Sequence, residues 1–188
     1  MTARKIFSFG KYLLIAAGVT VLGGLAFLYS GLYPMGADVP HNTLTIWALE
    51  TLRERSIVRA ASDIEVPEDL GSSDHLLKGG ADYNDMCAGC HLKPGKMQSD
   101  FTLGLYPAPP NLALHGDEHD HDEGQNGQVR RFWIIKHGIK ASGMPAWGPG
   151  HDDERIWNMV AFLDRLPTLS PEQYQILTAR GETNVDDN

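Results

Sequence analysis

Cysteine is scarce in this chain: among its 188 residues only Cys87 and Cys90 are cysteines. Without a second pair, a zinc site of the four-cysteine kind cannot be built. Both thiols stand in one short motif, CAGCH (residues 87–91), in which His91 follows the second cysteine directly. The chemistry of the chain therefore depends on what this motif holds.

Positive charge is also scarce beyond the first 33 residues. Arg4, Lys5 and Lys11 are the basic residues of 1–33, a stretch without any acidic residue. The remainder holds 13 basic and 24 acidic side chains, a formal net charge of −11. Such a surface repels phosphates, which argues against a nucleic-acid partner. A protein partner with a basic docking patch fits it better.

Charge of either sign is missing between Tyr12 and Ala37. As a helix, residues 12–33 would be about 33 Å long, enough to cross a bilayer core of about 30 Å. We expect an uncleaved transmembrane anchor. A signal peptide cut near Gly36 is the alternative, although secretory apolar segments are usually about 7–15 residues long. The basic residues before the span keep the N-terminus in the cytoplasm, so the rest of the chain lies outside.

The CAGCH motif has three possible roles: a disulfide, a zinc site or a haem attachment site. A Cys87–Cys90 disulfide suits an exported domain, and zinc would find three ligands here, although His91 sits awkwardly for a shared tetrahedron. A thioredoxin-like site would follow a strand, whereas the preceding residues have a helical period, with Leu76, Gly80 and Tyr83 on the face of Cys87. A haem uses every side chain of the motif: two thiols for its vinyl groups and an imidazole for its iron.

A haem iron has a sixth position, for which Met144 is the best candidate. It lies in the loop IKASGMPAWG, 53 residues after His91, a path long enough to pass round a haem. Gly143 permits close approach of the backbone, and Pro145 keeps Met144 extended. Met144 as a buried core residue is the alternative. His137 is the rival ligand, but its place at a predicted helix end is common for histidine.

Three segments, spanning roughly residues 73–167, resemble the class I cytochromes c, small helical proteins with one haem. They are GGADYNDMCAGCH, GIKASGMPAWG and DERIWNMVAFLDRLP. The resemblance implies thioether bonds to Cys87 and Cys90, with His91 and Met144 as axial ligands of one covalent haem c. It also implies that the carbonyl of Pro94 accepts the Nδ1 proton of His91.

The resemblance further implies that the first and last of these segments are helices that cross. The expected contacts at the crossing join Gly79 or Gly80 and Tyr83 to Met159 and Phe162. Helices are also expected over 128–139 and from Pro171 to Arg180, with Asp152 and the SPEQ sequence (170–173) as N-terminal caps. Residues 92–110 have no period and are expected to form a loop.

We predict an all-α chain of three parts: an anchor (1–37), a periplasmic helix with an acidic linker (38–72), and a cytochrome c domain wrapped around one haem (73–188). The helix at 43–61 is expected to be amphipathic, with Leu44, Trp47 and Ala48 beginning its apolar face and residues 53–55 in water. Residues 62–74 are expected to be a linker, which would reach about 40 Å if fully extended.

Residues 115–123 contain three histidines and five carboxylates. This composition suits zinc or copper, but nothing in the sequence fixes a ligand geometry. A solvated insertion is the preferred interpretation, and metal binding stays open.

A His/Met haem has no open iron position, which favours electron transfer over catalysis. By resemblance, the chain would be a membrane-tethered carrier in the bacterial inner membrane, with its haem domain in the periplasm. It would pass electrons from a quinol-oxidising cytochrome complex to a haem–copper oxidase. A haem subunit of a multi-subunit dehydrogenase or oxidase is the first alternative, favoured by the extra helix at 43–61. A haem-based sensor is the second.

Overall fold

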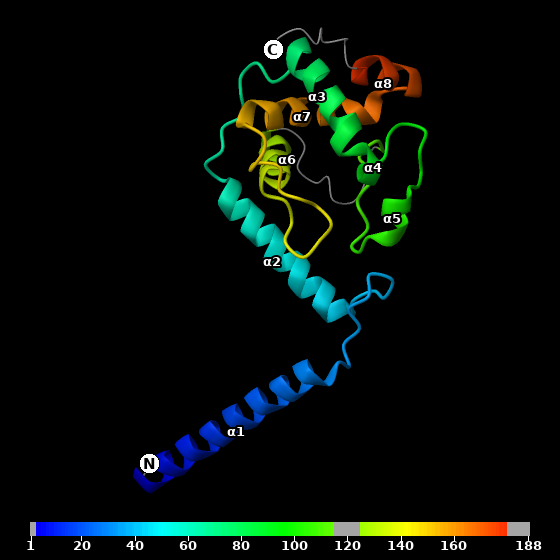
Figure 1. Cartoon of the computed structure of the whole chain (residues 1–188). Helices are drawn as coiled ribbons and strands as arrows, with labels where there is room; N and C mark the ends of the chain where they lie inside the picture. The colour runs from blue at the N-terminus through cyan, green and yellow to red at the C-terminus, as the bar shows by residue number, and fades with distance from the viewer. Residues whose placement is uncertain (1–2, 115–124, 180–188) are drawn as a thin grey trace, which may run out of the picture. The chain divides into compact units, whose positions relative to one another are not determined.

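The computed structural model describes residues 3–114 and 125–179 and divides the chain into two compact units, Met1–Val39 and Pro40–Asn188. Every regular element within the described ranges is a helix (Figure 1). The predicted all-α class is confirmed.

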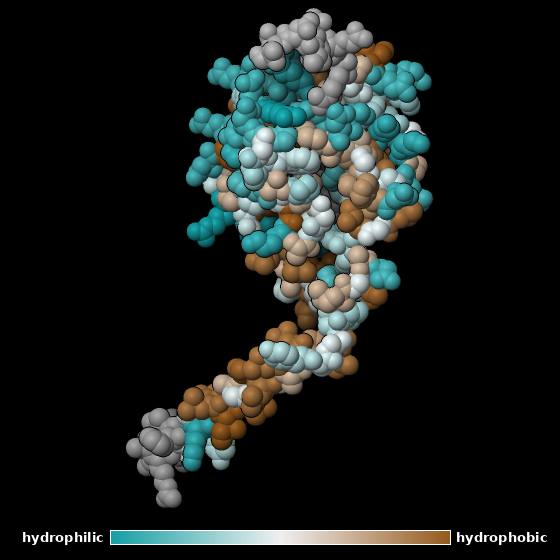
Figure 2. Space-filling model, in the orientation of Figure 1, coloured by the Kyte–Doolittle hydropathy of each residue, from teal (hydrophilic) through white to brown (hydrophobic). Residues whose placement is uncertain are grey.

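The first unit contains one long helix, α1 (Ala3–Ser30). Its stretch Ser8–Ser30 is long and apolar enough to cross a membrane, and apolar side chains cover most of the helix in Figure 2. Gly31, at φ +67°, ends it, because glycine enters the left-handed region without steric cost. The helix thus stops three residues before Tyr33, where the sequence predicted its end.

The second unit consists of helices and the segments that join them. They are α2 (Thr43–Ala61), α3 (Ser73–Met86), α4 (Ala88–His91), α5 (Asp100–Gly104), α6 (Gln125–His137), α7 (Asp153–Arg165), the 3₁₀ turn η1 (Leu166–Thr168) and α8 (Pro171–Thr178). Ser72, Asp152 and Ser170 cap α3, α7 and α8 by accepting backbone N–H groups, the last two as predicted. The short α5, capped by Ser99, was not predicted.

Helices α3 and α7 cross at the centre of this unit, as Figure 1 shows. A Cβ atom on Gly79 would lie 1.9 Å from the carbonyl oxygen of Asn158, so the two backbones meet where only glycine fits. One turn further, the rings of Tyr83 and Phe162 are 5.3 Å apart. The predicted crossing is therefore confirmed.

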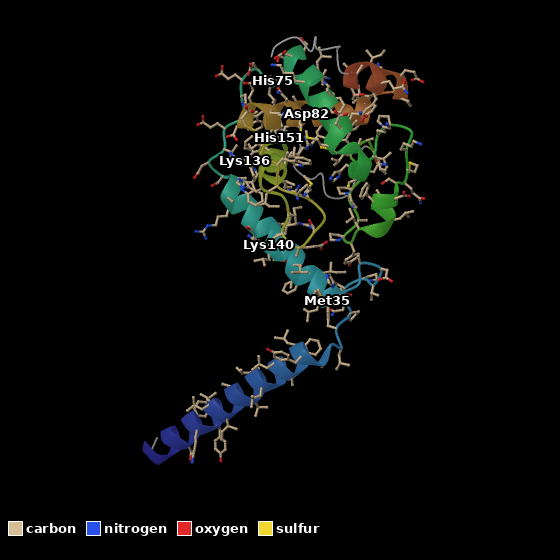
Figure 3. The ribbon with its side chains drawn as sticks, viewed as in Figure 1. Met35, His75, Asp82, Lys136, Lys140 and His151 are labelled. Carbon is tan, nitrogen blue, oxygen red and sulfur yellow. The ribbon has the colours of Figure 1, made fainter. Side chains whose placement is uncertain are left out.

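An ion pair supports the same crossing. Asp82, labelled in Figure 3, accepts hydrogen bonds from Nε and Nη2 of Arg155 at 2.6 and 2.9 Å. The hydrogen bonds to Asp82 raise the pKa of Arg155. Because Asp82 is buried and has this bidentate partner, the pair fixes the rotation of α3 against α7.

Helix α2 packs on α6, and the predicted apolar face is not the face that packs. Ile57 and Ala61 are buried, and Glu54 accepts hydrogen bonds from Arg130 of α6 at 2.9–3.3 Å. Leu44 and Trp47, expected to begin the apolar face, are 71% and 63% exposed. The prediction that residues 53–55 lie in water was wrong for Glu54, because its ion pair with Arg130 turns it towards α6.

The prediction of a linker over 62–74 is also wrong, because this segment packs on the core. Leu70 is buried in the core, and Ile64 and Val66 pack against the same cluster. Short turns fold the segment, with the N–H of Leu70 bonded to the carbonyl of Pro67 at 3.2 Å. Three apolar residues spaced through an acidic stretch give it a packed face, so α2 and α3 belong to one unit.

Candidate functional site

The CAGCH motif forms a tight turn at the end of α3. The N–H groups of Cys90 and His91 both bond to the carbonyl of Cys87, at 3.0 and 2.8 Å. Both thiols are free and partly buried. Burial, with the charge of Asp82, raises the pKa of the Cys87 thiol to about 12. This thiol is therefore protonated at neutral pH.

His91 is oriented by a bond from its ring. Nδ1 lies 3.0 Å from the carbonyl oxygen of Pro110, and the backbone carbonyl of His91 accepts from the N–H of Leu112 at 3.1 Å. Burial lowers the pKa of His91, although the bond to Pro110 acts in the opposite direction. A neutral imidazole that donates from Nδ1 carries its lone pair on Nε2, the atom that would bind a metal.

The expected acceptor, Pro94, does not have this role. Leu92 leaves the helix at φ +65°, and a turn through Pro94 and Gly95 follows, closed by a bond from the N–H of Lys96 to the carbonyl of Lys93. This turn takes the chain away from the ring. The segment around Pro110 lies beside His91 instead, a long-range contact that the sequence does not signal.

The side chain of Tyr83 is hydrogen-bonded to the backbone at the end of the CAGCH turn. Its hydroxyl donates to the carbonyl of Leu92 at 2.7 Å, with the carbonyl of His91 at 3.3 Å. The ring is 1% exposed, and burial raises the pKa of the phenol well above its usual range. Since Leu92 adopts a left-handed backbone that few residues tolerate, this bond stabilises the conformation that sets His91 in place.

The Met144 loop is bound to the end of α6 by backbone hydrogen bonds. The carbonyl of Met144 accepts from Ile139 at 3.1 Å, and the N–H of Trp147 donates to Ile135 at 3.1 Å. The hydroxyl of Ser142 accepts from the N–H of Met144 at 3.1 Å. Gly138, at φ +65°, lies so close to the loop that a Cβ would be 2.6 Å from the backbone of Pro145. The loop is therefore held in one conformation.

Cys87 and Met144 approach the same part of the core. Both are partly buried and pack against the cluster that contains Phe132, Ile156 and Met159. Residues 57 positions apart in the chain thus converge on one apolar cluster, which places the attachment turn and the methionine loop in one region of the unit.

The rival axial ligand His137 and the histidine-rich segment are the remaining candidate sites from the sequence. His137 is exposed at the end of α6, and its ring lies 4.8 Å from that of Trp133. It therefore sits at a helix end, as predicted. The histidine- and carboxylate-rich segment 115–123 lies outside the described residues, so its metal binding stays a prediction.

Sequence reasoning missed two histidines near the site, both labelled in Figure 3. Nε2 of His151 lies 3.2 Å from the sulfur of Met86, and its buried Nδ1 has no partner among the described residues. Nδ1 of His75 bonds to the side chain of Asn158. The contact of His75 joins α3 to α7, and the contact of His151 joins α3 to the loop before α7. No local sequence motif predicts either contact.

The donor set fits a covalently bound haem. Two free thiols and an imidazole lie on one turn, and the histidine is neutral with Nδ1 occupied. Cys87 and Cys90 would form the thioether bonds, and the sulfur of Met144 is a soft donor suited to haem iron.

Comparison with known protein families identifies the type of domain. Residues 74–163 match the family model described as cytochrome C oxidase, cbb3-type, subunit III. The chain carries a c-type cytochrome domain. Its cofactor is haem c, attached through Cys87 and Cys90, and its chemistry is electron transfer. No curated protein and no solved structure matches the chain.

The matched range begins one residue inside α3 and ends within α7. It therefore contains the attachment turn, the methionine loop and most of the helix crossing. Helix α2 and the packed segment 62–72 precede the cytochrome match, although they belong to the same compact unit.

Proposed function

We propose that the chain is a membrane-anchored electron carrier in which His91 and Met144 are the axial ligands of one haem c. The observation that carries the proposal is the His91 imidazole, held neutral by burial and fixed through Nδ1 at 3.0 Å from the Pro110 carbonyl. The haem supplies an iron that accepts and releases one electron. The protein supplies two ligands on rigid loops.

Rigidity of those loops suits electron transfer. The carbonyl of Met144 accepts from the N–H of Ile139, and the N–H groups of Trp147 and Gly148 donate to carbonyls of α6. The carbonyl of Leu92, next to His91, is bonded to the buried Tyr83. Ligands held in this way keep their positions when the charge of the iron changes. Two protein ligands also leave no open position for a substrate.

The apolar stretch Ser8–Ser30 supports the location. It would anchor the chain in the bacterial inner membrane, with Arg4 and Lys5 on the cytoplasmic side and the haem domain in the periplasm. The route that best fits this location runs from a quinol-oxidising cytochrome complex to a haem–copper oxidase. The net charge of −11 after residue 33 favours a basic docking patch on the partner.

A second candidate is a fixed haem subunit of a membrane-bound oxidase. It is favoured by the description of the matching family, which names an oxidase subunit. Purification of the haem-loaded chain from its native membranes in mild detergent separates the two. A carrier elutes alone, whereas a subunit elutes with its partners at a fixed stoichiometry.

Carbon monoxide binding tests whether protein ligands occupy both axial positions of the iron. We expect no carbon monoxide complex with the reduced native protein at neutral pH, because Met144 occupies the position that the gas would need. Tight binding would contradict the carrier function and support a sensor.

A further inference from the structure

Helix α2 has an apolar face that no other described helix covers. Because Ile57, Ala61 and Glu54 turn towards α6, the opposite face is exposed, with Leu44 at 71%, Trp47 at 63%, Leu52 at 68% and Val58 at 64%. At 100° per residue these four positions fall within about 140° of the helix circumference and run along nearly the whole helix. In Figure 2 brown side chains gather over its N-terminal half. Exposed apolar side chains gathered on one side of a helix mark an interaction surface.

The charges on this face are all positive. Arg55 and Arg59 lie on it and are exposed, at the C-terminal end. Of the acidic residues of the helix, Glu54 borders this face next to Trp47 and is paired with Arg130, and Glu50 lies farther round the helix. In a unit that is otherwise strongly acidic, this is a local apolar and basic surface. Its tryptophan, leucine and arginine side chains are residue types that occur in helices lying in a lipid interface.

The connection to the anchor keeps this face near lipid. Helix α1 ends at Ser30 and α2 begins at Thr43, so twelve residues join them. Fully extended, they reach only about 40 Å. If α1 crosses the membrane, the start of α2 stays within about 40 Å of the point where α1 leaves it, so the effective concentration of lipid around α2 is high.

We propose that α2 lies on the membrane surface through the face formed by Leu44, Trp47, Leu52 and Val58, with Arg55 and Arg59 bound to anionic lipid headgroups. The proposal rests on the membrane anchoring proposed above. Its consequence is that the haem domain keeps one side towards the bilayer instead of swinging on a tether.

A second contact links that orientation to the haem site. At the start of α2, the N–H of His41 donates to the hydroxyl of Tyr106 at 3.3 Å, and the two rings lie edge to face at 5.3 Å. Leu105 packs on Gly143 in the methionine loop, where a Cβ would be 2.8 Å from its side chain. The N-terminal end of α2 is thus joined through Tyr106 and Leu105 to the methionine loop, which ties the orientation of α2 to that of the loop.

The test uses the full-length, haem-loaded chain in liposomes of zwitterionic lipid with or without phosphatidylglycerol. Both native thiols are consumed by the haem, so a nitroxide on Leu52→Cys labels one position. Power saturation compares its collisions with oxygen, which enters lipid, and with a water-soluble nickel chelate. Glu50→Cys on the same helix and Ile176→Cys, an exposed apolar site on α8, are the controls.

We expect the ratio of oxygen to nickel accessibility at position 52 to exceed both controls several-fold in anionic liposomes. The double variant Arg55→Gln/Arg59→Gln should lower it to the value found in zwitterionic liposomes. Equal ratios at all three positions would overturn the proposal. Shielding of position 52 from both reagents would also overturn it, because a protein partner or a second copy would then cover the face.

Resistance to alkaline carbonate extraction is read on the same liposomes. A chain that is extracted lacks the anchor, and the proposed location fails. A chain that resists extraction but shows equal ratios keeps its anchor and loses only the role of α2.

Discussion

The two nitrogens of the His91 ring have different surroundings, and this difference determines what the side chain can do. Nδ1 is committed to the carbonyl of Pro110 at 3.0 Å. Burial lowers the pKa of the ring, so the imidazole is neutral at pH 7. A single backbone contact therefore selects the tautomer with a lone pair on Nε2. The residue that determines this tautomer, Pro110, lies in a loop 19 residues after His91.

A glycine determines the helix crossing at the same scale. Gly79→Ala would place a Cβ atom 1.9 Å from the carbonyl oxygen of Asn158, a backbone atom that cannot rotate away. We expect a loss of about 3 kcal/mol in the free energy of unfolding, at the upper end of overpacking effects. Denaturant unfolding of the haem-loaded protein measures it.

The matched control is Gly71→Ala, because a Cβ at Gly71 meets nothing within 4 Å. It should change the free energy of unfolding by less than about 0.5 kcal/mol. Equal stability of the two variants would show that α3 and α7 do not meet at Gly79.

At the scale of elements, α2 is attached to the cytochrome helices by a partly buried ion pair. Burial acts to raise the pKa of Glu54, but the hydrogen bonds from Arg53 and Arg130 outweigh it and lower that pKa below 4.5. A carboxylate with a lowered folded pKa stabilises the protein above its unfolded pKa. That stabilisation is lost as the pH falls through the folded value.

We therefore expect Glu54→Gln to reduce the free energy of unfolding by about 0.5–1 kcal/mol at pH 7, since water screens a carboxylate that is 39% exposed. The difference from the native protein should vanish as the pH falls well below 4.5. Denaturant unfolding at pH 7 and pH 3 measures it, with Glu50→Gln as the exposed control on the same helix. A difference that is independent of pH would contradict the role of the Glu54 charge.

The elements also show where sequence reasoning succeeds. The periods and caps of α3, α7 and α8 are local signals, as the bonds of Asp152 and Ser170 to backbone N–H groups illustrate. The CAGCH and methionine-loop motifs are local as well. The inward face of α2, the packing of Leu70 and the acceptor for His91 depend on partners that lie 19 or more residues away in the chain. No local pattern contains that information.

At the scale of the whole molecule, the charge is divided between a basic N-terminus and an acidic remainder of −11. Such a domain attracts cationic donors over a distance set by the ionic strength. The Debye length falls from about 30 Å at 0.01 M salt to about 3 Å at 1 M.

A cationic and an anionic small reductant test whether the acidic surface attracts positively charged donors. Reduction of the oxidised haem by the cationic hexaammineruthenium(II) should slow as salt rises, because screening removes the attraction. Reduction by the anionic iron(II)–EDTA complex should accelerate over the same range. Stopped-flow absorbance gives both rates, and two rates that salt leaves unchanged would contradict steering by the acidic domain.

The most direct test of the account is the absorption spectrum of the full-length haem-loaded chain and of Met144→Ala. We predict a covalent haem with sharp bands when reduced. When oxidised, the native protein should show the weak far-red band of sulfur-to-iron ligation, and Met144→Ala should lack it while its haem stays attached. Persistence of that band in Met144→Ala, or its absence from the native protein, would contradict His91/Met144 ligation and with it the closed-iron electron carrier.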